Sequence, residues 1–375
     1  MKNHDKVTQV FDQLCEKYSK NRRYKHFIIH AESMDQTFQY KHVSGVISSN
    51  QKPMTDQIPF NIASVTKLYI AAIIMMLQEE GLLSINDKLS KYLPQETLLN
   101  IHKTHTDELT IYHLLSHSSG IPDYLEIKNE HGKTLFDHIV NHGDHYWERK
   151  EFFQVIKDHK KSLFPPQPID SQKKKIRYSD TNYQLLMEII EKITQQSIEE
   201  VFEKRIYQPI KLEHTFHEGT KKSLSFHDKA SIWANDKEMI IPKALSSFKD
   251  IYSTSGEMIK FMKSLLLGDL FKSKHTTKQM ISNWNTFGFQ FIPTSPGWPI
   301  QYGLGFMRLK YPKFLPPFKD IPDFYGHTGV TGSWLFYCPA FDLIVAGDVG
   351  QLTASATPFR FMSELILKLK KMSSS

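Results

Sequence analysis

The chain is poor in cysteine, with Cys15 and Cys338 the only two among 375 residues. They lie far apart, so the sequence predicts neither a disulfide framework nor a zinc or redox centre built on closely spaced cysteines. His113 and His117 have the four-residue spacing of metal ligands on a helix, but no glutamate follows His113 as it does in zinc proteases. A structural role for both histidines is favoured, and we expect neither a metal nor a cofactor.

Long hydrophobic runs are also missing. The longest, residues 68–77, falls well short of the about 20 apolar residues that a membrane-spanning helix needs. Residues 1–6 are polar, and no apolar core or small-residue cleavage site of a signal peptide follows them. The sequence as written therefore predicts a cytoplasmic protein without a membrane span. An extracytoplasmic location is the alternative if an export signal has been trimmed.

Acidic residues are the minority among the charged ones, and the formal net charge is +7. The basic residues form only short, scattered clusters, at 160–161, 173–175 and 370–371, as expected of a solvated surface. No nucleic-acid-binding motif accompanies them, so we expect no nucleic-acid partner.

The two ends of the chain predict similar elements in opposite order. Apolar residues at 7, 10, 11, 14 and 18 have helical spacing, and strand-like runs follow at 26–31 and 37–46. Near the other end, runs at 333–337 and 343–349 predict a hairpin, and Thr357 followed by Pro358 marks the start of a last helix. The middle, from about 64 to 270, is mainly helical in pattern, for example at 68–80 and 183–194.

These patterns predict an α+β fold. Both termini would build one antiparallel sheet flanked by helices, and the middle would form a mainly helical second region beside it. We expect a single catalytic domain, residues 1–375, with an α/β part of about 1–60 plus 300–375 and a helical part of about 61–299. A ligand cleft is expected between the two parts.

Ser64 stands just before the helical run at 68–80, with Lys67 three residues further on. In the first turn of a helix these side chains share a face, so the amine can reach the hydroxyl. Serine needs a base to become a nucleophile, and burial or a nearby cation can lower a lysine pKa enough for it to serve. The free N–H of Ser64 at the helix start can help to hold an oxyanion. Taken alone, the pair fits an N-cap serine and a surface lysine better.

A second segment with reactive side chains precedes the helix predicted at 183–194. Tyr178 stands just outside that helix, with Ser179 or Asp180 as its cap. A tyrosine beside a lysine ammonium loses its proton more readily and can act as a base. A half-buried aromatic ring and a capping aspartate are the alternative interpretation.

A third segment, residues 325–332, is rich in glycine and contains His327, Thr328 and Gly329. It opens the C-terminal hairpin, where an edge strand can present backbone N–H groups to a substrate. The alternative is a glycine-rich turn with an incidental histidine.

Together these three segments resemble the three motifs of the penicillin-binding protein and serine β-lactamase superfamily. The motifs are serine-x-x-lysine at 64–67, tyrosine-x-aspartate at 178–180 and histidine-threonine-glycine at 327–329. Segments 81–89, 114–120 and 302–306 are similar to further family segments, and all follow in the family's order. The resemblance covers nearly the whole chain and is strongest to the branch of class C β-lactamases and D-alanyl-D-alanine carboxypeptidases.

The resemblance implies a β-lactamase/transpeptidase-like fold and a serine hydrolase that forms an acyl-enzyme on Ser64. Lys67 and Tyr178 would move protons, and the N–H groups of Ser64 and Val330 would form the oxyanion hole, a pair of donors worth about a hundred- to a thousandfold each in rate. The residues implied to bind substrate are Asp180, His327, Thr328, Gly329 and Val330.

Two positions depart from the commonest family pattern. Asp180 stands where asparagine is usual, and an ionised aspartate accepts hydrogen bonds but donates none. His327 stands where lysine is usual, and histidine offers a charge to a substrate carboxylate only when protonated. We therefore expect a D-alanyl-D-alanine carboxypeptidase-like enzyme or an esterase or amidase, acting on a D-amino-acid peptide, an ester or a β-lactam. A true β-lactamase, or a penicillin-binding sensor without turnover, is the alternative.

Overall fold

The computed structural model describes residues 4–129, 131–159, 162–220, 222, 228–289, 297–311 and 321–374. Across these residues its largest element is an eight-stranded sheet with the strand order β2-β1-β13-β12-β11-β10-β9-β8, antiparallel throughout. In that order the strands are β2 (Gln39–Gly45), β1 (His26–Ser33), β13 (Leu343–Asp348), β12 (Trp334–Cys338), β11 (Phe324–Thr328), β10 (Met307–Leu309), β9 (Ile300–Tyr302) and β8 (Asn285–Thr286).

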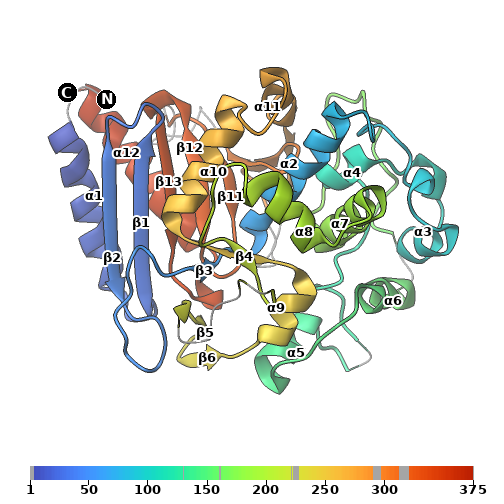
Figure 1. Cartoon of the computed structure of the whole chain (residues 1–375), viewed down its shortest axis with the longest axis horizontal. Helices are drawn as coiled ribbons and strands as arrows, with labels where there is room; N and C mark the ends of the chain where they lie inside the picture. The colour runs from blue at the N-terminus through green and yellow to red at the C-terminus, as the bar shows by residue number, and fades with distance from the viewer. Residues whose placement is uncertain are drawn as a thin grey trace.

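Helices cover both faces of this sheet (Figure 1). The first and last helices, α1 (His4–Ser19) and α12 (Thr357–Ser374), pack together on one face, and α10 (Ser255–Leu267) contacts β1, β12 and β13 on the other. Because both faces are covered, β1 and β13 are buried along almost their whole length. The predicted α+β fold, with one antiparallel sheet built from both termini, is confirmed.

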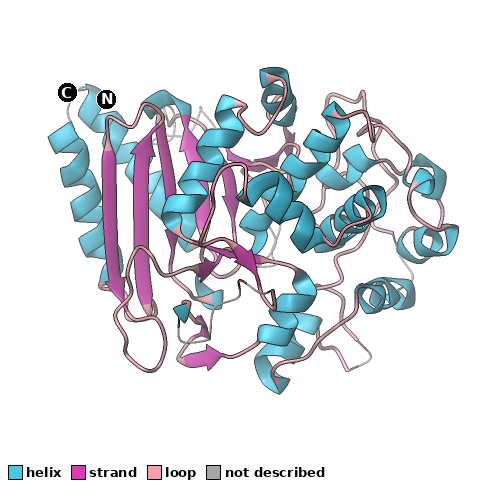
Figure 2. Ribbon diagram, in the orientation of Figure 1, coloured by secondary structure: helices cyan, strands magenta, loops and turns pink. Residues whose placement is uncertain are grey.

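A mainly helical region lies beside the sheet (Figure 2). Its central helix, α2 (Thr66–Glu79), is buried on every residue from Thr66 to Leu77, as expected of a helix that is apolar around its circumference. It contacts both β11 and α7 (Asp180–Thr194). The remaining helices are α3 (Gln95–Ile101), α4 (Ile111–Leu115), α5 (Leu135–His142), α6 (Arg149–His159), α8 (Ile198–Phe202), α9 (Pro242–Phe248) and α11 (Lys274–Met280).

Short strands interrupt the helical region. β3 (Phe60–Asn61), β7 (Ile251–Ser253) and β4 (Phe216–His217) form a small sheet in that order, and β5 (Ile232–Ala234) pairs with β6 (Lys237–Met239). These strands are not predicted from the sequence, because a run of two or three residues is too short to show an alternating pattern. The small sheet matters for the site because β3 leads directly into the turn that carries Ser64.

The individual elements predicted at both ends of the chain are confirmed, including the hairpin of β12 and β13. Both cysteines are free, buried thiols, as the sequence predicts. Among the helices that the structure describes, none combines the length and the apolar character needed to cross a membrane.

Candidate active site

Ser64 occupies a tight turn, η1 (Ala63–Val65), between β3 and α2. Its side chain is partly exposed, whereas Ala63 and Val65 on either side are buried. Ala63 has a positive φ of 44°, and its N–H donates to Oδ1 of Asn61 at 2.9 Å. A residue with a side chain in this conformation is strained, and such residues gather at functional sites. The turn therefore presents the Ser64 hydroxyl to solvent from an otherwise buried segment.

Lys67 lies one helical turn beyond Ser64 and donates to the Ser64 Oγ from its Nζ at 3.0 Å. The lysine is 4% exposed, and its ammonium also forms an ion pair with Asp180 at the start of α7. Burial alone would lower the pKa of Lys67, but the charges of Asp180, Tyr178 and Asp250 together outweigh it, and the pKa lies above its usual range. Lys67 is therefore charged before substrate arrives, and it is not the surface lysine of the alternative interpretation.

Tyr178 completes this group from the segment before α7. The Lys67 Nζ lies 5.1 Å from the centre of the Tyr178 ring, and the phenol hydroxyl interacts with both Lys67 and Ser64. Burial raises the pKa of Tyr178 above its usual value, while the Lys67 charge acts in the opposite direction. The resting phenol is neutral, and its proton is held next to a cation that stabilises the ionised form.

His117 packs against the Tyr178 ring. The two ring centres are 4.5 Å apart, and Nδ1 of His117 accepts the backbone N–H of Ser179 at 3.2 Å. Burial and the nearby Lys67 charge hold the pKa of His117 well below its usual value, so the ring is neutral. His113, by contrast, caps α4 by accepting the N–H of Thr110 at 3.0 Å. The structure thus gives each of these histidines contacts within the protein, as the favoured structural role requires.

The turn between β11 and β12 lies against the segment that leads into η1. Thr331 Oγ1 donates to the carbonyl of Asn61 at 3.0 Å, and Ser333 Oγ donates to the carbonyl of Ile62 at 2.8 Å. These bonds tie the turn to the two residues that lead into η1. A Cβ on Gly329 would lie 2.6 Å from the Ile62 carbonyl oxygen and 2.9 Å from Cβ of Ala63, so this close approach requires glycine.

His327 lies on β11 with no exposed surface. Its Nε2 accepts from the Tyr302 hydroxyl at 3.0 Å, and its Nδ1 donates to the carbonyl of Thr328 at 2.7 Å. Burial, followed by the charge of Lys67, lowers the pKa of His327 to about 3. The residue is therefore a neutral, internally bonded side chain, and it offers no charge to a substrate carboxylate near neutral pH.

His327 should make the protein sensitive to acid. Because its folded pKa lies below the ordinary value of 6.5, the unfolded chain takes up the proton first. Its contribution to stability is complete above pH 6.5 and is lost as the pH falls from 6.5 toward 3. Changing His327→Gln keeps a neutral polar side chain, and the free energy of unfolding of this variant is expected to fall less steeply as the pH drops.

Urea unfolding of the wild type and of His327→Gln across this pH range gives the free energy of unfolding of each protein, and the two pH dependences are then compared. His217 is also buried with a lowered pKa and contributes to both slopes, whereas His117 interacts with His327, so the difference between the slopes reports on His327 together with its effect on His117. An identical dependence on pH in the two proteins would contradict neutral burial of His327.

Two carboxyl groups near this centre were not anticipated from the sequence. Burial and then the charge of Asp180 raise the pKa of Asp123 well above its usual value. Burial raises the pKa of Asp250 to about 7, with Lys67 acting to lower it and Asp180 to raise it. Asp123 follows a proline in a loop and Asp250 follows a helix end, and neither position carries a pattern that marks a site.

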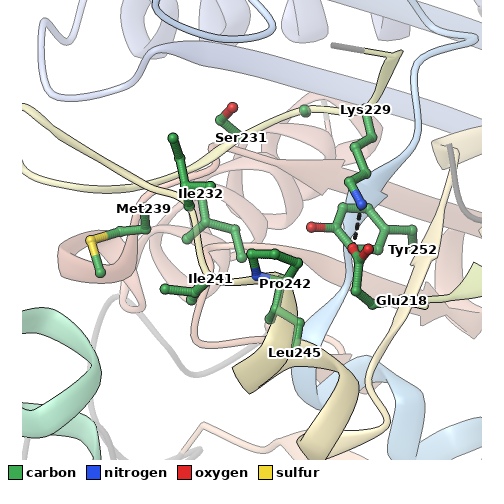
Figure 3. Close-up of a pocket in the computed structure, with 11 residues that line it drawn as sticks. Glu218, Lys229, Ser231, Ile232, Met239, Ile241, Pro242, Leu245 and Tyr252 are labelled. Carbon is green, nitrogen blue, oxygen red and sulfur yellow. Dashed lines mark hydrogen bonds and ion pairs between the residues drawn. The ribbon is translucent and has the colours of Figure 1, made fainter. Parts of the chain in front are cut away.

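A cavity of about 210 Å³ lies on the side of β7 that faces the β5–β6 hairpin (Figure 3). Its polar lining includes Glu218 and Lys229, which form a buried ion pair, and the Lys229 Nζ lies 4.8 Å from the centre of the Tyr252 ring. The rest of the lining is mainly apolar. Because the two charges neutralise each other, Lys229 supplies no free positive charge to the neighbouring Ser64 region.

Comparison with known proteins identifies the family of this chain. The family model named Beta-lactamase matches residues 35–350. The chain is 27% identical over 216 residues to penicillin-binding protein 4* of Bacillus subtilis, a match that covers 55% of this chain and 40% of that protein. It is 24% identical over 327 residues to a putative D-alanyl-D-alanine carboxypeptidase of Escherichia coli, covering 78% of this chain and 69% of that protein.

Among solved structures, the D-amino acid amidase of Ochrobactrum anthropi SV3, crystallised with L-phenylalanine amide, superposes with a TM-score of 0.73. It is 18% identical, and the match covers 99% of each chain. At this level of sequence identity, the similarity between the two structures supports a shared fold and no more.

Proposed function

As the chain belongs to the beta-lactamase family, whose model matches residues 35–350, it is a serine hydrolase, and we propose that it cleaves esters or amides through an acyl-enzyme on Ser64. The observation that carries this proposal is the 3.0 Å contact of Lys67 Nζ with Ser64 Oγ, in a turn where Ser64 reaches solvent and its neighbours do not. Tyr178 lies against both side chains.

In the acylation step, Ser64 Oγ attacks the carbonyl carbon and its proton passes to the Tyr178 oxygen, from which the phenol's own proton is displaced toward the leaving group. Asp180 keeps Lys67 charged, so the lysine stabilises the phenolate and orients the hydroxyl instead of taking the proton itself. Tyr178 then gives the proton to the departing alcohol or amine. In deacylation, a water molecule attacks the acyl carbon and loses a proton to Tyr178, which returns it to Ser64.

The oxyanion of each tetrahedral intermediate would be held by the backbone N–H groups of Ser64 and Val330. Val330 follows Gly329 in the turn that is tied to η1, so its N–H can approach the same carbonyl oxygen. Within the residues described, neither N–H donates to a protein acceptor. Two free donors on adjacent turns can serve this stabilisation.

His327 favours the esterase or amidase interpretation over a carboxypeptidase or a true β-lactamase. A D-alanyl-D-alanine peptide and a β-lactam both carry a carboxylate next to the bond that breaks, and the lysine usual in the family would bind it. Here that position holds a neutral, buried imidazole. The site is therefore better suited to a substrate without that carboxylate.

A panel of substrates tests this preference. We expect the highest kcat/KM for p-nitrophenyl acetate or D-alanine p-nitroanilide, and values at least about tenfold lower for a D-alanyl-D-alanine peptide and a chromogenic cephalosporin, because an unmatched carboxylate loses a charged hydrogen bond. The highest kcat/KM on the cephalosporin would overturn the preference in favour of a β-lactamase. A stable cephalosporin adduct with no turnover of any substrate would instead support the sensor function.

A further inference from the structure

Asp250 is fixed next to the Ser64 turn by the residue that follows it. The N–H of Ile251 donates to Thr66 Oγ1 at 3.2 Å, and the carbonyl of Ile251 accepts the N–H of Ile62 at 3.0 Å. Ile62 and Thr66 lie on either side of Ser64, so these two bonds clamp the start of β7 to the turn. The Asp250 carboxylate is consequently close enough for its charge to act on both Lys67 and Asp180.

The cations nearest to Asp250 along the chain and the strand are already paired. Lys249 extends to Glu199, with the Nζ 2.7 Å from Oε1, and Lys229 pairs with Glu218 in the cavity of Figure 3. Within the described part of the chain, Asp250 itself has neither a hydrogen bond nor an ion pair, and it remains partly exposed. Burial raises the pKa of Asp250 to about 7, so a cationic ligand beside it would favour the ionised carboxylate and gain an ion pair.

The other two carboxyl groups of the site are already engaged. Asp180 is bound to the Lys67 ammonium. Asp123 is 6% exposed and accepts the N–H of Leu125 at 3.0 Å. Of these three carboxyl groups, Asp250 is the one that is partly exposed and has no partner among the described residues, so it is available to a cationic ligand.

We propose that Asp250 binds a free ammonium group of the substrate, so that the enzyme acts on esters or amides of amino acids whose amino group is unblocked. This inference rests on the proposed role of Ser64 and specifies the substrate class of that site. The ammonium of the acyl portion would pair with Asp250 while the carbonyl carbon lies at Ser64 Oγ. Blocking the amine removes the charge and the pairing with it.

The test uses competition between two amides that differ only in the amine. p-Nitrophenyl acetate is the reporter substrate, and D-alaninamide and N-acetyl-D-alaninamide are the competitors, each characterised by its inhibition constant at neutral pH. The wild-type protein should bind D-alaninamide more tightly than the acetylated amide. The preference is the inhibition constant of N-acetyl-D-alaninamide divided by that of D-alaninamide. In Asp250→Asn this ratio should fall by about 10- to 100-fold, the range expected for loss of a hydrogen bond between charged groups.

Two further variants complete the experiment. Asp250→Glu keeps the carboxylate and should retain most of the preference. Asp236→Asn makes the same chemical change at a side chain that is 93% exposed, and its ratio should equal that of the wild type. An unchanged ratio in Asp250→Asn, or a wild-type preference for the acetylated amide, would overturn the inference. Failure of the underlying proposal is recognised separately, because p-nitrophenyl acetate would then be hydrolysed equally by Ser64→Ala.

Discussion

Replacing Ser64 by alanine is expected to lower kcat/KM on p-nitrophenyl acetate by at least about a thousandfold, because removal of a nucleophile leaves only binding and oxyanion stabilisation to accelerate the reaction. The fold should be retained. Ser64 is partly exposed, and its side chain interacts with Lys67, at 3.0 Å, and with the Tyr178 hydroxyl, so its loss should change stability by about 1 kcal/mol.

A matched control exists at the start of α10. Ser255 is also a serine at the beginning of a helix, it is 1% exposed, and its Oγ has no hydrogen-bond partner within the described structure. Ser255→Ala should keep wild-type turnover. Initial rates on the three purified proteins, with circular dichroism as the check of folding, decide the outcome. Turnover that persists in folded Ser64→Ala would show that Ser64 is not the nucleophile.

Replacing Lys67 by methionine is expected to have the second largest effect, a loss of about a hundred- to ten-thousandfold in kcat/KM. The change keeps the length and removes the cation that orients Ser64 and stabilises the ionised Tyr178. It also leaves Asp180 without its ion-pair partner. Because the Asp180 side chain is 20% exposed, we expect destabilisation of about 1–3 kcal/mol, less than for a fully buried pair.

The chain provides a close match for this variant. Lys263 on α10 is 7% exposed and pairs with Glu32 of β1, with the Nζ 2.6 Å from Oε2. Lys263→Met should therefore destabilise the protein by a similar amount and leave kcat/KM unchanged. Urea unfolding and ester hydrolysis, measured on both variants, separate the loss of an ion pair from the loss of the reaction. Equal activities in the two variants would mean that Lys67 serves only the fold.

Local sequence patterns predict much of the fold and of the candidate site. The helix and strands at each end have regular spacing over many residues, and Ser64, Tyr178 and Gly329 stand at element boundaries that such spacing reveals. In the structure, the Ser64, Tyr178 and Gly329 segments meet around one turn, because β3, β11 and the residues before α7 converge there.

Other features depend on contacts between distant segments, which no single stretch of sequence displays. His327 is neutral because Tyr302 and the surrounding core enclose it, and the sequence shows only a histidine in a glycine-rich run. Asp250 reaches the site because Ile251 pairs with the Ser64 turn across nearly two hundred positions of chain, as the bond from Ile251 to Thr66 records.

Covalent labelling tests the central claim most directly. The wild-type protein would be treated with a p-nitrophenyl phosphonate ester, which phosphonylates an activated serine and releases p-nitrophenol, and then digested for peptide mass spectrometry. If Ser64 is the nucleophile, we expect one phosphonyl group per chain, located on Ser64, and none on Ser64→Ala under the same conditions. A label on a different residue of the wild-type protein, or equal labelling of Ser64→Ala, would contradict it.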